Sequence, residues 1–121
     1  LEAVRTYHEG WAHDHVDSSY HAPTYLYFLC NPAARSLRLE GLKILHQHVP
    51  VNDNRFWRED RVAVAFGRLL SVALSENANE IAEDQSASSA YIAFALKLTS
   101  LQHPLGQELL TAAGKRFAAP S

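Results

Sequence analysis

The sequence predicts an all-α domain built of antiparallel helical hairpins. Two observations indicate this class: apolar residues recur with a helical period along most of the chain, and no stretch alternates apolar and polar residues between turn signals. The Asn-Gly and Asp-Gly pairs that mark tight β-hairpins are also absent from the sequence. With 121 residues, of which 47% are hydrophobic and 20% charged, residues 1–121 suit a single globular domain.

The best-marked helix begins at Asn31-Pro32, where a capping side chain precedes a proline at the first helical position. We expect this helix to reach about His48 and to stop at Val49-Pro50, because a residue before proline disfavours the helical conformation. The stretch "VPVNDN" then indicates a turn. Upstream, residues 1–11 favour a helix, and "PTYLYFLC" suits either a short helix or an extended segment.

Three further helical regions follow the turn. A second helix is predicted from about Arg55 to Ser75, with the polar stretch "SENANEIAEDQSASS" interrupting or ending it. A third covers about Ser88 to Gln102. His103-Pro104 opens a fourth, which Gly114 is expected to close. Helices joined by short turns are typical of αα-hairpins.

The second and third helices indicate where the core lies. At about 100° per residue, one side of the second helix is an apolar stripe that should face the core: Phe56, Val62, Phe66, Leu69, Leu70, Ala73 and Leu74. The third helix carries apolar residues on every side, so we expect it to be the most buried element. Its lysine, Lys97, should pack its stem on apolar neighbours and reach solvent with its ammonium group.

Internal similarity favours a layered arrangement of helical pairs. "GLKILHQHVP" (residues 41–50) resembles "ALKLTSLQHP" (residues 95–104), and each is followed by an amphipathic helix. With "NPAARSLRLEGLKIL" and "HPLGQELLTAAG", these segments resemble armadillo and HEAT-type helical repeats over roughly residues 31–118. The resemblance implies a solenoid-like fold. The offset between the similar segments exceeds the usual repeat length of about 40–47 residues, so a closed helical bundle is the alternative.

Composition disfavours several classes of partner and location. The formal net charge of −2 lacks the basic excess typical of nucleic-acid-binding domains. No apolar run approaches the roughly 18 residues of a membrane span, and no signal-peptide pattern is present. The single cysteine, Cys30, has no partner for an internal disulfide. The chain begins at Leu1 and contains no methionine, so we expect a fragment of a longer intracellular polypeptide, from cytoplasm or nucleus.

Residues 8–21, "HEGWAHDHVDSSYH", raise the question of a metal site. Glu9, His13 and Asp17 follow one another at four-residue intervals, so each neighbouring pair could chelate one ion from the same face of a helix. Such ligands need partners from elsewhere in the chain, and no pattern supplies them. A solvated helix end is the simpler interpretation, so no cofactor is predicted. A metal-dependent enzyme or metal-binding fragment centred on His8–His21 is the alternative.

No catalytic constellation stands out in the sequence. The glycines are isolated, so no phosphate-binding loop is present, and both Gly-x-Ser-x-Gly and His-Glu-x-x-His are missing. Paired carboxylates such as Glu59 with Asp60 indicate solvated charges near a helix end. The chain is therefore not predicted to be an enzyme.

The best functional hint lies on the second helix, opposite its apolar stripe. Arg58, Arg61 and Arg68 share this side, and Trp57 lies beside Arg61 and is predicted to face away from the core. Exposed tryptophan and arginine side chains are enriched among the residues that dominate binding at protein interfaces. We therefore predict a non-enzymatic protein-interaction or scaffold domain that binds another protein or an acidic peptide segment through Trp57, Arg58, Arg61 and Arg68.

Three other interpretations of this region stay open. Trp57 could cover a neighbouring helix while the arginines pair with the acidic residues of 76–84. Three arginines could instead hold a phosphate. A small helical regulator that homodimerises through its apolar third helix is a further alternative.

Overall fold

The structure is a computed structural model that describes residues 22–58 and 60–117. Its described residues form helices and turns without a strand, which confirms the predicted all-α class. In chain order the elements are α2 (Ala22–Cys30), the 3-10 helix η1 (Pro32–Leu37), α3 (Arg38–His48), α4 (Asn54–Trp57), α5 (Asp60–Glu76), α6 (Ala78–Glu83), α7 (Gln85–Ser100) and α8 (Gly106–Phe117). Within these ranges, none of the helices has both the length and the apolar character needed to cross a membrane.

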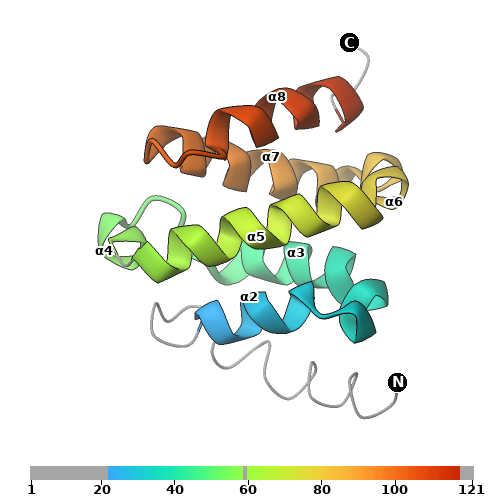
Figure 1. Cartoon of the computed structure of the whole chain (residues 1–121), viewed down its shortest axis with the longest axis horizontal. Coiled ribbons are helices and arrows are strands. Elements are labelled where there is room, and N and C mark those ends of the chain that lie inside the picture. The colour runs from blue at the N-terminus through green and yellow to red at the C-terminus, as the bar shows by residue number, and fades with distance from the viewer. Residues whose placement is uncertain (1–21, 59, 118–121) are drawn as a thin grey trace.

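The longer helices stack side by side with their axes close to parallel (Figure 1). Helix α2 packs on α5, α3 packs on α7, and α7 packs on α8. As Figure 1 shows, α2, α5 and α8 run in one direction along the stack, whereas α3 and α7 run in the other. The chain therefore reverses direction between each of these helices and the next, from α2 to α3, to α5, to α7 and to α8.

Capping side chains begin the helices where the sequence indicates. The Asn31 side chain accepts a hydrogen bond from the Ala33 amide at 2.9 Å, which confirms the start predicted at Asn31-Pro32. The first turns are 3-10 in η1, and the α-helical part, α3, ends at His48 before the predicted turn. The segment "PTYLYFLC", which suits either conformation by sequence, lies within the helix α2.

The region predicted as a second helix from Arg55 to Ser75 is divided into two. Helix α4 ends at Trp57, and α5 begins at Asp60 and continues to Glu76. The polar stretch after α5 contains a further short helix, α6, which the sequence pattern marks only as an interruption. Helix α7 then starts at Gln85, because the Asp84 side chain caps it by accepting a hydrogen bond from the Ala87 amide at 3.1 Å.

The prediction that Gly114 closes the last helix is wrong. Helix α8 passes through Gly114 and ends at Phe117. The Phe117 ring is buried and packs edge-on against Tyr91 of α7, with 5.1 Å between the ring centroids. Burial of this aromatic ring stabilises the last turn by more than the roughly 1 kcal/mol that a glycine costs inside a helix.

An aromatic cluster fills the core where α4, α5 and α7 meet. The Phe66 ring lies 4.8 Å from the Trp57 ring and 4.6 Å from the Phe94 ring, measured between centroids. The predicted apolar stripe faces this core: Phe56, Val62, Phe66, Leu69, Leu70 and Ala73 are buried, and Leu74 is half-buried. Such tilted aromatic pairs add to the energy of apolar burial.

Helix α7 has apolar residues on every side, but it is not buried on every side. It packs against α3, α5 and α8, but its remaining side faces outward, where Leu96 is 53% exposed. Lys97 is half-buried and places its ammonium nitrogen 5.8 Å from the centre of the Trp57 ring. This position agrees with a lysine whose stem packs on apolar neighbours, and a cation over an aromatic face is a favourable contact.

A buried arginine, Arg38, joins the end of α2 to α3. Its Nε donates a hydrogen bond to the Leu29 carbonyl oxygen at 2.7 Å, and its Nη2 donates to the carbonyl oxygens of Cys30 at 3.2 Å and Asn31 at 3.3 Å. The last carbonyls of a helix have no partner within the helix. Arg38 therefore provides the donors that the buried end of α2 needs.

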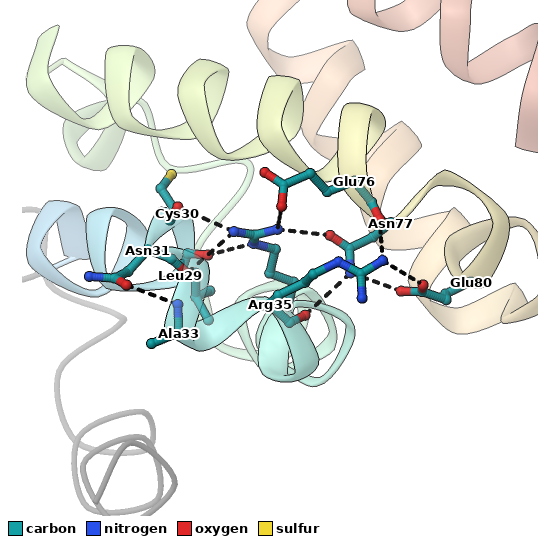
Figure 2. Close-up of polar contacts among 9 residues, drawn as sticks. Leu29, Cys30, Asn31, Ala33, Arg35, Glu76, Asn77 and Glu80 are labelled. Carbon is teal, nitrogen blue, oxygen red and sulfur yellow. Dashed lines mark hydrogen bonds and ion pairs between the residues drawn. The ribbon is translucent and has the colours of Figure 1, made fainter. Parts of the chain in front are cut away.

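The same guanidinium reaches the end of α5. Its Nη1 donates to Asn77 Oδ1 at 3.1 Å and lies 3.2 Å from a carboxylate oxygen of Glu76. Figure 2 shows that Asn77 continues the network, since its amide nitrogen donates to the Arg35 carbonyl oxygen and to the Glu80 carboxylate. The segment from the end of α2 to the start of α3 is thereby joined, at one end of the stack, to the distant junction of α5 with α6.

Replacing Phe94 with alanine should lower the free energy of unfolding by about 3–5 kcal/mol, because a large buried ring leaves a cavity between Trp57 and Phe66. Urea denaturation followed by circular dichroism measures this loss. A loss below about 1 kcal/mol would contradict the core position of α7.

Replacing Arg38 with methionine should cost about 2–5 kcal/mol, because the carbonyl oxygens at the end of α2 would stay buried without donors. Arg35→Met is the matched control. Its half-exposed ion pair with Glu80 should contribute less than about 1 kcal/mol. Equal losses in the two variants would show that burial of Arg38 has no special role.

Candidate functional site

The four residues predicted to bind a partner differ in their exposure to solvent. Arg58, Arg61 and Arg68 are exposed, as expected. Trp57 is only 3% exposed, and its indole Nε1 donates a hydrogen bond to the Pro50 carbonyl oxygen at 3.2 Å. The prediction that Trp57 faces away from the core is therefore wrong. The helix is interrupted between α4 and α5, so a projection that assumes one continuous helix places Trp57 on the wrong side.

Two other side chains supply exposed apolar surface beside the arginines. Tyr27 of α2 is 45% exposed, and Val64 of α5 is 51% exposed. Val64 lies three residues after Arg61 and four before Arg68, so its place among the arginines was visible in the helical period. Tyr27 carries no comparable signal, because its exposure depends on how α2 packs against α5.

These side chains line a hollow between α2 and α5, here called the first hollow. It has a volume of about 510 Å³. Its lining residues are Pro23, Thr24, Tyr27, Asp60, Arg61 and Val64.

A second hollow, of about 470 Å³, lies on the other side of α5 beside the turn between α7 and α8. Its lining residues are Trp57, Asp60, Ala63, Val64, Leu101, Gln102, His103 and Pro104. Asp60 and Val64 line both hollows. The two hollows therefore adjoin each other across the first turns of α5, and together they are called the trough.

The wall formed by the α7–α8 turn is held in place by its backbone. Gln102 has a φ of 59°, and the His103 amide donates to the Leu98 carbonyl oxygen at 3.0 Å, an arrangement that ends helices. The Leu105 amide then donates to His103 Nδ1 at 3.2 Å. The other side of the His103 ring lies against Gly67, where an added Cβ would approach His103 Cε1 to 3.0 Å. The imidazole thus forms a supported part of the trough wall.

Four basic side chains lie in or near the trough, and one of them, Arg61, lines it. Arg61 lines the first hollow, Arg58 follows the lining residue Trp57, and Lys97 places its ammonium over the ring of that tryptophan. Arg68 lies further along α5, close enough to Cys30 to oppose the burial that raises the pKa of that thiol. The carboxylate of Asp60 lies at the middle of the trough. The lining of the trough itself therefore carries one arginine, Arg61, and one carboxylate, Asp60.

A separate polar hollow of about 440 Å³ lies between α3 and the start of α7. Its lining residues are Lys43, His46, Gln47, Gln85, Ser86 and Ser89. Lys43 Nζ lies 2.7 Å from Asp84 Oδ2. That lysine is therefore engaged in joining α3 to the cap of α7.

The alternative metal ligands Glu9, His13 and Asp17 lie outside the described residues, so the metal-binding interpretation stays a prediction. Among residues 22–58 and 60–117, no three histidine, cysteine or acidic side chains gather closely enough to hold a metal ion.

Comparison with protein-family models, with curated proteins and with solved structures finds no match for the chain. Function is therefore inferred from the trough and its charges.

Acid should weaken the contact between α3 and α7. The hydrogen bonds from Lys43 and from the Ala87 amide hold the pKa of Asp84 below its usual range. A carboxyl group whose pKa is lower in the folded state stabilises the fold above its unfolded pKa of about 3.9, and loses this effect as the pH falls through the folded value.

Lys43→Met should raise the pKa of Asp84, as measured by NMR titration of its carboxyl carbon. The variant should also show a shallower loss of stability below about pH 4. An unchanged pKa in the variant would contradict the assignment of the shift to Lys43.

Proposed function

We propose that this chain is a non-enzymatic protein-interaction domain that binds an acidic segment of another protein in the trough. The observation that carries the proposal is the trough itself, which exposes Tyr27 and Val64 beside Arg61 in the first hollow and Leu101 in the second. Contiguous apolar surface rimmed by polar groups is typical of a binding site on a globular domain.

Energetics support a protein partner. Covering Tyr27, Val64 and Leu101 would bury apolar surface that contributes roughly 25 cal/mol per Å². Tyrosine and arginine are both enriched among residues that dominate binding energy. The surrounding arginines would speed association with an acidic partner and select it over a basic one.

We also propose that the helices form a solenoid-like stack of the armadillo and HEAT type. In chain order, the antiparallel helices α3 and α5 are followed by the antiparallel helices α7 and α8, and the second two pack directly on each other. Equivalent helices pack on each other in the same direction, α3 on α7 and α5 on α8 (Figure 1). Helix α2 packs on the other side of α5 in that same direction, as the second helix of a preceding pair would. Nearest-neighbour stacking of this kind supports a solenoid over a bundle closed around one core.

The similar segments support the same arrangement. Residues 41–50 end α3 and residues 95–104 end α7, at the same end of the stack. Each segment leads through a proline-containing turn into the next helix of its pair.

Selection of peptides from a random display library against the purified chain tests the proposed function. The selected peptides should be rich in acidic and large apolar residues. Val64→Glu should weaken their binding by more than about tenfold, because it puts a charge in the middle of the trough. Leu96→Glu is the matched control, since Leu96 is an equally exposed aliphatic residue on the outer side of α7, and should leave binding unchanged. Peptides that bind the Val64 variant as tightly as the unaltered chain would overturn the proposal.

Charge reversal at Arg61 tests the electrostatic part. Arg61→Glu should leave the melting curve nearly unchanged, because exposed substitutions usually shift stability by less than about 0.5 kcal/mol. Binding of the selected acidic peptides should weaken, and this loss should shrink as salt rises, because exposed charges are screened. Unfolding of the variant would instead show that Arg61 stabilises the domain from within.

A further inference from the structure

A local hydrogen bond of one kind recurs ahead of several helices in the described part of the chain. A side-chain atom two bonds beyond Cβ accepts a hydrogen bond from the backbone amide two residues further on. The donor and acceptor pairs are the Ala33 amide with Asn31 Oδ1 at 2.9 Å, the Arg55 amide with Asp53 Oδ1 at 2.9 Å, and the Leu105 amide with His103 Nδ1 at 3.2 Å. These contacts precede η1, α4 and α8, respectively.

The His103 contact differs from the other two in its response to acid. An amide oxygen gains no proton near neutral pH, and an aspartate carboxylate ordinarily gains one only at about pH 4, whereas an imidazole ordinarily gains its second proton at about pH 6.5. Nδ1 accepts a hydrogen bond only while the ring is neutral, because both ring nitrogens are donors in the imidazolium form. Protonation at Nδ1 therefore removes the acceptor of the Leu105 amide and leaves the contacts of Asn31 and Asp53 in place.

The backbone of the same turn does not depend on this proton. The Gln102 amide donates to the Thr99 carbonyl oxygen at 3.0 Å, and the His103 amide donates to the Leu98 carbonyl oxygen at 3.0 Å, a pair of bonds that closes helices. The Gly106 amide donates to the His103 carbonyl oxygen, also at 3.0 Å. These bonds use backbone atoms alone, so protonation acts on the His103 ring rather than on the path of the chain.

The ring is held between the Leu105 amide and α5. On the α5 side it lies against Gly67, where an added Cβ would approach His103 Cε1 to 3.0 Å. The His103 side chain is half-buried and lines the second hollow. Loss of the bond to the Leu105 amide removes one of these two constraints, so the ring can turn about its side-chain bonds and alter the hollow that it lines.

Charged side chains on the neighbouring elements act on an imidazolium at this place. Asp60 lies seven residues before Gly67, on the same face of α5, and lines the same hollow, so its carboxylate attracts a positive ring. Lys97 of α7 places its ammonium over the Trp57 ring and repels it, and Glu108 lies in the first turn of α8. The end of α7 and the start of α8 also act on a positive charge in opposite senses. These charges oppose one another, whereas the hydrogen bond at Nδ1 always favours the neutral ring.

We infer that His103 is a pH-sensitive cap: when Nδ1 takes up a proton from solvent, the Leu105 amide loses its acceptor, the ring turns away from it, and the second hollow changes shape. The neutral and protonated forms of an imidazole ordinarily interconvert between about pH 5 and pH 8. The inference concerns the free chain, so it goes beyond the proposed function and does not depend on what the trough binds.

Solvent exchange of backbone amides, measured by NMR on the whole chain from about pH 8 to about pH 5, tests the inference. Exchange of the Leu105 amide, relative to the intrinsic rate of a free amide at each pH, should rise about two- to tenfold on acidification, as expected for the loss of one hydrogen bond. The amides of Ala33 and Arg55 are internal controls and should show no such rise. The midpoint of the rise should coincide with the midpoint of the His103 ring signals.

His103→Asn is the matched variant. The asparagine oxygen takes the place of Nδ1 two bonds beyond Cβ and gains no proton in this range, so the Leu105 amide should stay protected throughout. Leu101 lines the second hollow, and its methyl signals should shift with pH in the unaltered chain and stay constant in the variant.

Each outcome supports or overturns the inference. An unchanged Leu105 amide, or a rise shared equally by Ala33 and Arg55, overturns it. A rise at Leu105 that persists in His103→Asn also overturns it, because another group would then be the one that titrates. Constant Leu101 signals in the unaltered chain overturn the change of the hollow. The internal controls lie in the unaltered chain, so they decide the matter even where the variant fails to fold.

Discussion

The arrangement of the helices depends on the buried guanidinium of Arg38. Removing this charge from water costs several kcal/mol, and the cost is offset by hydrogen bonds to the carbonyl oxygens that end α2 and by contacts with Glu76 and Asn77. The partners come from the end of α2 and from the junction of α5 with α6, so the contacts form only when both of these ends lie beside the start of α3. Burial of Arg38 therefore selects one packing of three segments.

The trough follows from this packing. Arg38 holds the carboxyl end of α2 at one end of the stack, and the helix then runs beside α5 so that Tyr27 lies near Arg61 and Val64. At the opposite end, the aromatic cluster around Trp57 joins α4, α5 and α7. Both hollows lie over the first turns of α5, at the end of the stack that holds the aromatic cluster, and Trp57 belongs both to that cluster and to the lining of the second hollow.

Local signals account for much of the fold. Asn31-Pro32 marks a helix start because the asparagine side chain bonds to an amide two residues away, and Val49-Pro50 marks a stop for an equally local steric reason. The apolar stripe of α5 identifies its buried face through the helical period alone. The helical period predicts the wrong side for Trp57 because it assumes one continuous helix, whereas α4 ends at Trp57 and α5 begins at Asp60. That interruption depends on how α4 packs.

The sequence by itself determined the all-α class, the helix start at Asn31-Pro32 and its end at His48, the buried face of α5 and the exposure of Arg58, Arg61 and Arg68, because capping and periodicity act within a few residues. Only the tertiary structure decided that Trp57 is buried, that α8 continues past Gly114, and that Tyr27 joins the arginines at the trough. These features depend on contacts between side chains that are distant in sequence. No local preference specifies such contacts, since each is set by which helices lie side by side.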